Sequence, residues 1–195
     1  MQVYMLGLPA RATVDTKEVR KEVLVNRLVP LLAMALLLFA SSTMAGPEKV
    51  AFPPYQTHVL YTVVDRPDIK EIRDIYVNPD TTRMAKPGQP LPSGTVLTFV
   101  HFKARVDDKG ELVKDPNGRL VRGDLDRIGV MEKRTGWGVE YPDDIRNGEW
   151  EYALFRPTGT RNEQANIKAC FQCHKPLPSG QDFVFTFSKL VSAPK

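Results

Sequence analysis

The chain holds only two cysteines, Cys170 and Cys173, and His174 directly follows the second. Residues three apart on a helical turn point the same way. Two thiols placed in this way can each bond to one of the two vinyl groups on a porphyrin edge, and the adjacent imidazole can reach the iron. The pentapeptide CFQCH therefore matches the C-x-x-C-H attachment motif of c-type haem. It predicts a covalently bound haem c with His174 as an iron ligand.

Two other uses of a cysteine pair fit the sequence less well. A thioredoxin-like redox pair opens a helix after a strand in a βαβ unit, whereas this pair comes late in the chain. A structural zinc site needs four ligands, and the only further histidines are His58 and His101. Haem attachment is the interpretation that the spacing favours.

A second protein ligand for the iron is hard to find in the sequence. Small electron-carrier cytochromes place the motif early and use a later methionine, but no methionine follows Met131. Met84 and Met131 lie upstream, and Met131 alternates with strand-like neighbours as a core residue does. A single protein ligand leaves the sixth position open or water-filled, which favours ligand binding or chemistry over simple electron transfer.

The first 45 residues differ in character from the rest of the chain. Residues 28–40 are apolar and uncharged, basic Arg20, Lys21 and Arg27 precede them, and the small residues SSTMA follow. This order is typical of a secretory signal, and the apolar run is shorter than the about 20 residues that a membrane-spanning helix needs. We predict a signal peptide over 1–45, or a shorter one that starts further downstream. An uncleaved membrane anchor is the alternative.

The remaining residues, 46–195, have the length of one domain, here a single c-type haem domain. The net charge of the whole chain is +4, and its basic residues are interleaved with acidic ones. Nucleic acid is therefore not an expected partner. Export predicts a location in the periplasm, an oxidising compartment in which a cysteine pair is also able to form a disulfide.

Strand-like segments dominate this domain. Segment 95–107 is rich in β-branched and aromatic residues and predicts a long strand, and turn residues predict a hairpin over 111–123. Isoleucines at helical spacing predict a helix over 66–78, and a second helix is expected over 162–175, which holds the haem motif. Further strands are expected at 58–65, 126–134, 149–157 and 181–190. The sum is an α+β fold, mainly an antiparallel β-sheet with a few short helices and with the haem motif on a C-terminal helix.

Four stretches resemble the cytochrome P-460 family, which includes the β-sheet cytochrome c′ group: LPSGTVLTF, IGVMEKRTGWGVEYPDD, NGEWEYALF and ACFQCHKPLPSGQDFVFTF. The resemblance covers roughly residues 75–190 and implies an exported, dimeric haem protein built around an antiparallel sheet. In one branch of the family a lysine is joined to the porphyrin, and the enzyme oxidises hydroxylamine, chiefly to nitrous oxide. The other branch lacks this bond, has an apolar pocket with phenylalanines, and binds nitric oxide.

The resemblance also suggests candidate residues for the cofactor pocket. Lys103 is the only lysine on the strand that matches the family's cross-linking strand, and a solvated strand lysine is the alternative. Alternation places Phe99 and His101 on the face of Lys103. There Phe99 is a candidate pocket wall, and His101 is a candidate distal group or a surface histidine. Arg73 is the candidate for a family arginine that lines the pocket, with an exposed helix position as the alternative.

Oxidation of hydroxylamine also needs a proton acceptor, because the substrate loses protons together with electrons. A carboxylate in a low-dielectric pocket has a raised pKa and can serve this purpose. Glu132 is the best match to the glutamate that this family uses as a catalytic residue. An exposed carboxylate paired with a neighbouring cation is the alternative for Glu132.

The leading hypothesis is a periplasmic mono-haem c-type cytochrome that oxidises hydroxylamine to nitrous oxide. A partner cytochrome would accept the electrons, and the chain would form a homodimer. The alternatives are a non-enzymatic nitric oxide-binding protein and a simple electron-transfer cytochrome. A bond between Lys103 and the haem would indicate hydroxylamine oxidation, and its absence would indicate nitric oxide binding.

Overall fold

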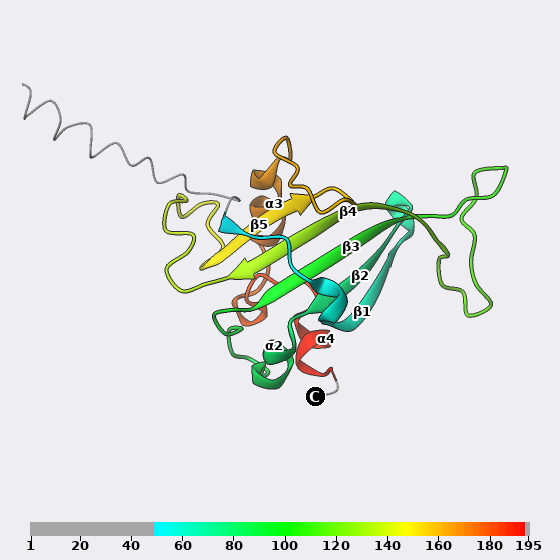
Figure 1. Cartoon of the computed structure of the whole chain (residues 1–195). Coiled ribbons are helices and arrows are strands. Elements are labelled where there is room, and N and C mark those ends of the chain that lie inside the picture. The colour runs from blue at the N-terminus through cyan, green and yellow to red at the C-terminus, as the bar shows by residue number, and fades with distance from the viewer. Residues whose placement is uncertain (1–48, 194–195) are drawn as a thin grey trace, which may run out of the picture. The chain divides into compact units, whose positions relative to one another are not determined.

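The computed structural model describes residues 49–193, and the predicted signal peptide, 1–45, lies outside the described residues. Five strands form one antiparallel sheet in the order β1-β2-β3-β4-β5 (Figure 1). Three short α-helices accompany the sheet, so the fold class is α+β, as the sequence predicted. The elements are β1 (Val59–Arg66), β2 (Glu71–Val77), α2 (Pro79–Met84), β3 (Val96–Ala104), β4 (Arg122–Lys133), β5 (Trp150–Phe155), α3 (Ile167–His174) and α4 (Phe187–Val191), with 3-10 turns η2 (Tyr55–Thr57), η3 (Pro67–Ile69) and η4 (Ser179–Gln181).

The sequence predicted most of these elements correctly: four segments predicted as strands overlap with β1, β3, β4 and β5, and the predicted helix over 162–175 contains α3. The CFQCH motif lies on α3, and one further short helix, α4, follows it. None of the helices within residues 49–193 is both long and apolar enough to cross a membrane.

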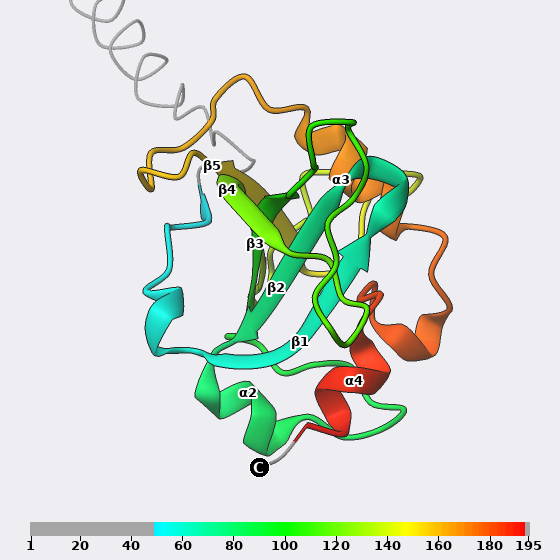
Figure 2. The ribbon, with the colours of Figure 1, turned by 90° about the vertical axis from the view of Figure 1, so that its right-hand side faces the viewer.

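Alternation along the strands gives the sheet two faces, which different parts of the chain cover. On one face, Leu97 and Met131 belong to a core cluster shared with residues of α3 and α4. On the other face, Val100 and Ile128 pack with Val50 from the start of the described chain. Figure 2 shows this first segment and the C-terminal helices on opposite sides of the sheet. We call the side beneath α3 and α4 the helix-covered face.

Segment 66–78 forms a strand, and the predicted helix there is wrong. Only the single turn η3 precedes β2, which pairs with β1 on one side and β3 on the other. Ile72 and Ile75 point to opposite faces and are 1% and 2% exposed, because a central strand of this sheet is covered on both sides. Their spacing of three therefore reflects the burial of two faces of a strand, a setting that suits β-branched side chains.

The predicted final strand over 181–190 is also wrong, because this segment holds the end of η4 and most of α4. Asp182 and Phe183 have φ angles of 45° and 61°, which lie outside the extended region that a strand requires. The phenylalanines that suggested alternation do not share a face. Phe187 is buried in the core, whereas Phe185 is 57% exposed.

Most of the hairpin predicted over 111–123 belongs to a longer arm, residues 105–121, that projects from the ends of β3 and β4 (Figure 1), and the last two residues of the prediction begin β4. An isolated bridge joins Lys114 to Leu120. Between them, Asp115 accepts hydrogen bonds from two backbone N–H groups of the turn. The turn prediction is therefore confirmed, and the arm lies apart from the residues discussed below.

Candidate haem site

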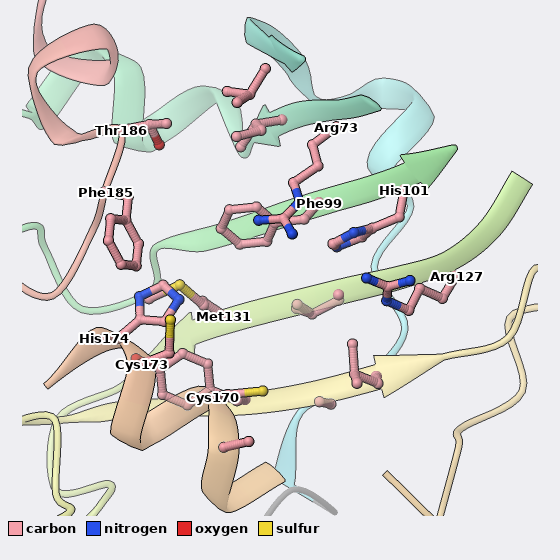
Figure 3. A pocket seen from close by; sticks show the side chains of 18 of the residues that line it. Arg73, Phe99, His101, Arg127, Met131, Cys170, Cys173, His174, Phe185 and Thr186 are labelled. Carbon is pink, nitrogen blue, oxygen red and sulfur yellow. The ribbon is translucent and has the colours of Figure 1, made fainter. Parts of the chain in front are cut away.

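A cavity of about 720 Å³ lies between the helix-covered face of the sheet and α3 (Figure 3). This volume falls within the range of about 300–1,000 Å³ that is common for small-molecule and cofactor sites. Phe99 and His101 of β3 and Gly129 and Met131 of β4 line the cavity at every second position. The alternation of the strands therefore decides which side chains can meet a bound molecule.

Helix α3 presents the whole attachment motif to the cavity. Cys170, Cys173 and His174 all line it, and both thiols are free. Phe171, on another side of the helix, is 1% exposed and anchors α3 in the core. Pro176 follows the helix closely and cannot continue it. A helix that ends here places both thiols and the imidazole along one wall.

The imidazole of His174 has one nitrogen engaged with the protein. Its Nδ1 lies 2.6 Å from the carbonyl oxygen of Phe183. A carbonyl oxygen only accepts, so Nδ1 carries the proton and Nε2 holds the lone pair that a metal ligand needs. Burial lowers the pKa of His174, although the bond to Phe183 opposes this, and a neutral ring is favoured. The rings of Tyr152 and Phe185, with centroids at 5.2 and 4.9 Å, flank it.

A buried ion pair supports the loop that carries the Phe183 carbonyl. Asp182 accepts hydrogen bonds from Nζ of Lys133 and from the backbone N–H of Leu91, each at 2.8 Å. Both residues of the ion pair are largely buried. Asp182 and Phe183 adopt left-handed backbone conformations, which are unfavourable for residues with a side chain. The ion pair therefore helps to hold a strained turn in the position that orients His174.

The middle of the opposite wall is apolar. Ile75, Phe99 and Met131 line it from three neighbouring strands. Phe99, the predicted wall residue, therefore reaches the cavity. Arg73 also lines the cavity, but it stands on β2 rather than on the predicted helix. Met131 is a core residue, as predicted, with an exposed fraction of 2%, and it is part of this wall as well.

Charged groups gather around His101 at one end of this wall. Nδ1 of His101 lies 2.9 Å from Oε1 of Glu71, and Arg127 donates to the second oxygen of Glu71 at 2.6 Å. Arg73 donates to the first oxygen. Burial alone would raise the pKa of Glu71, but the hydrogen bonds from His101 and Arg73 outweigh it and hold this pKa well below its usual value. Glu71 is therefore a buried, ionised carboxylate.

Lys103 does not reach the cavity. Alternation puts it on the face of Phe99 and His101, but its side chain is exposed and it is absent from the residues that line the cavity within 49–193. In the register of β2 and β3, Lys103 lies opposite Glu71, near the end of β3 and beyond His101. The strand face assigned to Lys103 thus suits a cavity residue, but its position along the strand does not.

Glu132 lies on the wrong face of the sheet for the predicted proton acceptor. Side chains of β4 alternate, so Glu132 points away from the face on which Gly129 and Met131 line the cavity. It is 7% exposed and accepts a hydrogen bond from Nε of Arg134 at 2.7 Å. The paired carboxylate, which was the alternative for this residue, describes its surroundings better.

Sequence reasoning missed Glu71 and Arg127. Glu71 falls in the segment predicted as a helix, where its spacing of two from Arg73 has no meaning, whereas in a strand the two share a face. Arg127 lies opposite His101 in the β3–β4 register. The strand propensity of the isoleucines in β2 could have revealed Glu71, but the pairing with Arg127 requires the register itself.

Comparison with known families adds one positive result. The family model described as Cytochrome P460 matches residues 55–186, well over half of the chain. The matched segment includes all five strands and α3 with the attachment motif. A search of curated proteins found no match.

Proposed function

Because this chain belongs to the cytochrome P460 family and is thus a haem-binding cytochrome, we propose that thioether bonds from Cys170 and Cys173 hold haem c in the cavity, with His174 as iron ligand. Each thiol would add across one vinyl group, with its sulfur on one carbon and its hydrogen on the neighbouring carbon, so that no electron would be gained or lost. The free thiols, the oriented imidazole and the volume of the cavity fit this group. When bound, haem would supply an iron that can take a small ligand.

The function that this geometry supports best is the binding of nitric oxide. One observation carries the proposal: Ile75, Phe99 and Met131 make the middle of the wall opposite α3 apolar, while Lys103 and Glu132 are not among the residues that line the cavity. The two side chains proposed for hydroxylamine chemistry are therefore not in place. An apolar wall offers no hydrogen bonds, so a small uncharged ligand loses the least when it leaves water.

Titration of the reduced holoprotein with nitric oxide, followed by absorption spectroscopy, tests this function. We expect saturation at one nitric oxide per chain, because the cavity holds one attachment motif. The variant Lys103→Ala serves as a control, since this residue shares the strand face of Phe99 but lies outside the cavity, and its titration should match the wild type. A six-coordinate, low-spin iron that does not respond to nitric oxide would indicate an electron-transfer cytochrome instead.

Oxidation of hydroxylamine is the second candidate, and the presence of His101 in the cavity wall favours it. Conversion of two hydroxylamine molecules into nitrous oxide and water releases four protons and four electrons. The protons require an acceptor in the cavity, and we assign the electrons to a partner cytochrome. Nitrous oxide formed in the presence of an oxidised c-type cytochrome would establish this activity.

We also propose that the protein is exported to the periplasm and forms a homodimer. Export rests on the predicted signal sequence over 1–45, and the dimer rests on the resemblance to the family. N-terminal sequencing of the protein from a periplasmic extract and light scattering of the purified holoprotein test these two proposals separately.

A further inference from the structure

We infer that His101 is the proton-accepting group of the cavity, and that it speeds the binding of ligands that release a proton as they bind, while nitric oxide binds without this help. Small ligands that are protonated in water and bind as anions form this class. This inference rests on the proposed haem in the same cavity, and it deepens that proposal by naming the residue that meets the ligand.

Hydrogen bonding fixes which ring nitrogen of His101 carries the proton. Nδ1 lies 2.9 Å from a carboxylate oxygen of Glu71. An ionised carboxylate can only accept, so Nδ1 donates and Nε2 keeps its lone pair. Within residues 49–193, Nε2 of His101 makes no hydrogen bond. This atom is not one of the fully buried polar atoms, so it is accessible. Because His101 lines the cavity, this lone pair is available to a ligand there.

Gly129 leaves the space beside Nε2 open. A Cβ at this position would lie 3.4 Å from Nε2 of His101, and Gly129 itself lines the cavity. Its φ angle is not positive, so the backbone does not require glycine here. The missing side chain instead matters for space, since a longer one would cover the imidazole. Glycine on β4 and histidine on β3 therefore act together as one feature of the wall.

Burial lowers the pKa of His101 and so favours a neutral ring, while the charged groups that face the ring act in both directions. They are Glu71 and Arg73 on β2 and Arg127 on β4, and Arg66 of β1 lines the same cavity. Burial lowers the pKa of His101, Arg127 lowers it further, and Glu71 opposes both. The ring is thus an uncharged base, and the carboxylate beside it can stabilise the charge that appears when Nε2 takes a proton.

Glu71 is a positioning residue in this arrangement. Arg73 and Arg127 each bind one of its oxygens, so its carboxylate cannot easily turn away from His101. A carboxylate fixed on one nitrogen of an imidazole sets the tautomer and orientation of the ring, as in hydrolase triads. The buried carboxylate of Glu71 is paired with two partly exposed guanidinium groups, which meets the condition that a buried charge has a partner.

This arrangement discriminates between ligands by their chemistry. A ligand that must lose a proton as it binds is helped by a base within hydrogen-bond reach, and the middle of the wall is apolar. Nitric oxide carries no proton, so a base gives it no such help. The ratio of the two association rates therefore reports on His101.

Hydrogen cyanide is a suitable probe, because it is protonated at neutral pH and binds ferric haem as the anion. We propose stopped-flow measurement of cyanide and nitric oxide association in the wild-type holoprotein and in His101→Phe and His101→Gln. In both variants the association rate of cyanide, relative to that of nitric oxide, should fall by about a hundredfold, which is the lower end of the effect of general base catalysis. The glutamine amide can still donate to Glu71 but cannot accept a proton. Lys103→Ala should leave the ratio at the wild-type value.

The pH profile gives a second measure of the same group. The cyanide rate of the wild type should fall only below the ordinary histidine pKa of about 6.5, because burial keeps His101 unprotonated to lower pH. Glu71→Gln removes the negative charge that favours protonation. It should therefore move the midpoint of the profile to a still lower pH, which a merely structural role of Glu71 would not do.

If His101→Gln leaves the ratio of the cyanide and nitric oxide association rates unchanged, the inference is overturned. This variant is decisive even if His101→Phe fails to fold. That result would leave nitric oxide binding, and hence the proposed function, intact. Low-spin iron in the wild type that becomes high-spin in His101→Gln would also overturn it, because His101 would then be an iron ligand. A wild-type holoprotein that binds cyanide but not nitric oxide would count against the proposed function instead.

Discussion

The double variant Cys170→Ser, Cys173→Ser is expected to lose all of the haem that stays with the chain on a denaturing gel. A serine hydroxyl does not form the thioether, and His174 alone cannot hold haem once the protein unfolds. Haem staining of the gel, normalised to total protein, measures the effect. The loss should be complete because no other cysteine exists in the sequence.

The two single variants provide the matched controls for this experiment. Cys170→Ser and Cys173→Ser each keep one thiol on the cavity wall, so each should retain stained chain at a reduced level. Exposed Ser179 in η4, changed to alanine, should stain like the wild type. Haem that remains attached in the double variant would show that another side chain holds it.

Phe171→Ala is expected to lower the free energy of unfolding by about 3–5 kcal/mol, the usual cost of removing a buried phenylalanine ring. Phe171 is 1% exposed, and its ring centroid lies 4.4 Å from that of Tyr141 and 4.6 Å from that of Tyr152. These contacts fix α3 against the core through a side chain that does not itself line the cavity. Urea unfolding of the holoprotein, followed by far-UV circular dichroism, measures the change.

Val139→Ala is a suitable control for Phe171→Ala, because Val139 is 64% exposed and its truncation should cost no more than about 0.5 kcal/mol. Equal stability of the two variants would contradict the position assigned to α3. A loss confined to Phe171→Ala would show that core packing behind the motif, and not only the covalent bonds, holds the haem wall in place.

The attachment motif could be found from the sequence because its chemistry is local. Cys170, Cys173 and His174 lie within one short helix, so their arrangement does not depend on distant segments. The partner of His174 is different in kind. The Phe183 carbonyl is aimed by a left-handed turn and by an ion pair between Asp182 and Lys133, 49 residues apart in sequence. No periodicity in the sequence reveals such a contact.

The opposite wall was predicted only in part, for a physical reason that β4 makes clear. The last six residues of β4, 128–133, are all buried, because both faces of the sheet are covered there. Apolar alternation is then absent, and the face of Glu132 cannot be read from its neighbours. On β3 the shared face of Phe99 and His101 was inferred correctly. How far along that face the cavity extends depends on where α3 packs.

The two walls of the cavity therefore play separate roles in this account. The α3 wall carries the residues proposed to attach haem, and the sheet wall carries the residues proposed to choose the ligand. Phe99 and Met131 make the middle of the sheet wall apolar, and His101 with Glu71 adds one oriented base at its end. A change of ligand preference is thus expected from substitutions on β3 and β4, without loss of the cofactor.

The intact mass of the purified holoprotein under denaturing conditions tests the central claim most directly. The account predicts the mass of the processed chain plus one unmodified haem, because Cys170 and Cys173 add to the vinyl groups without loss of hydrogen and Lys103 lies outside the cavity. A mass of chain plus haem less two hydrogens would contradict the placement of Lys103. A haem-free chain lacking two hydrogens, with its two thiols joined to each other, would contradict the account as a whole.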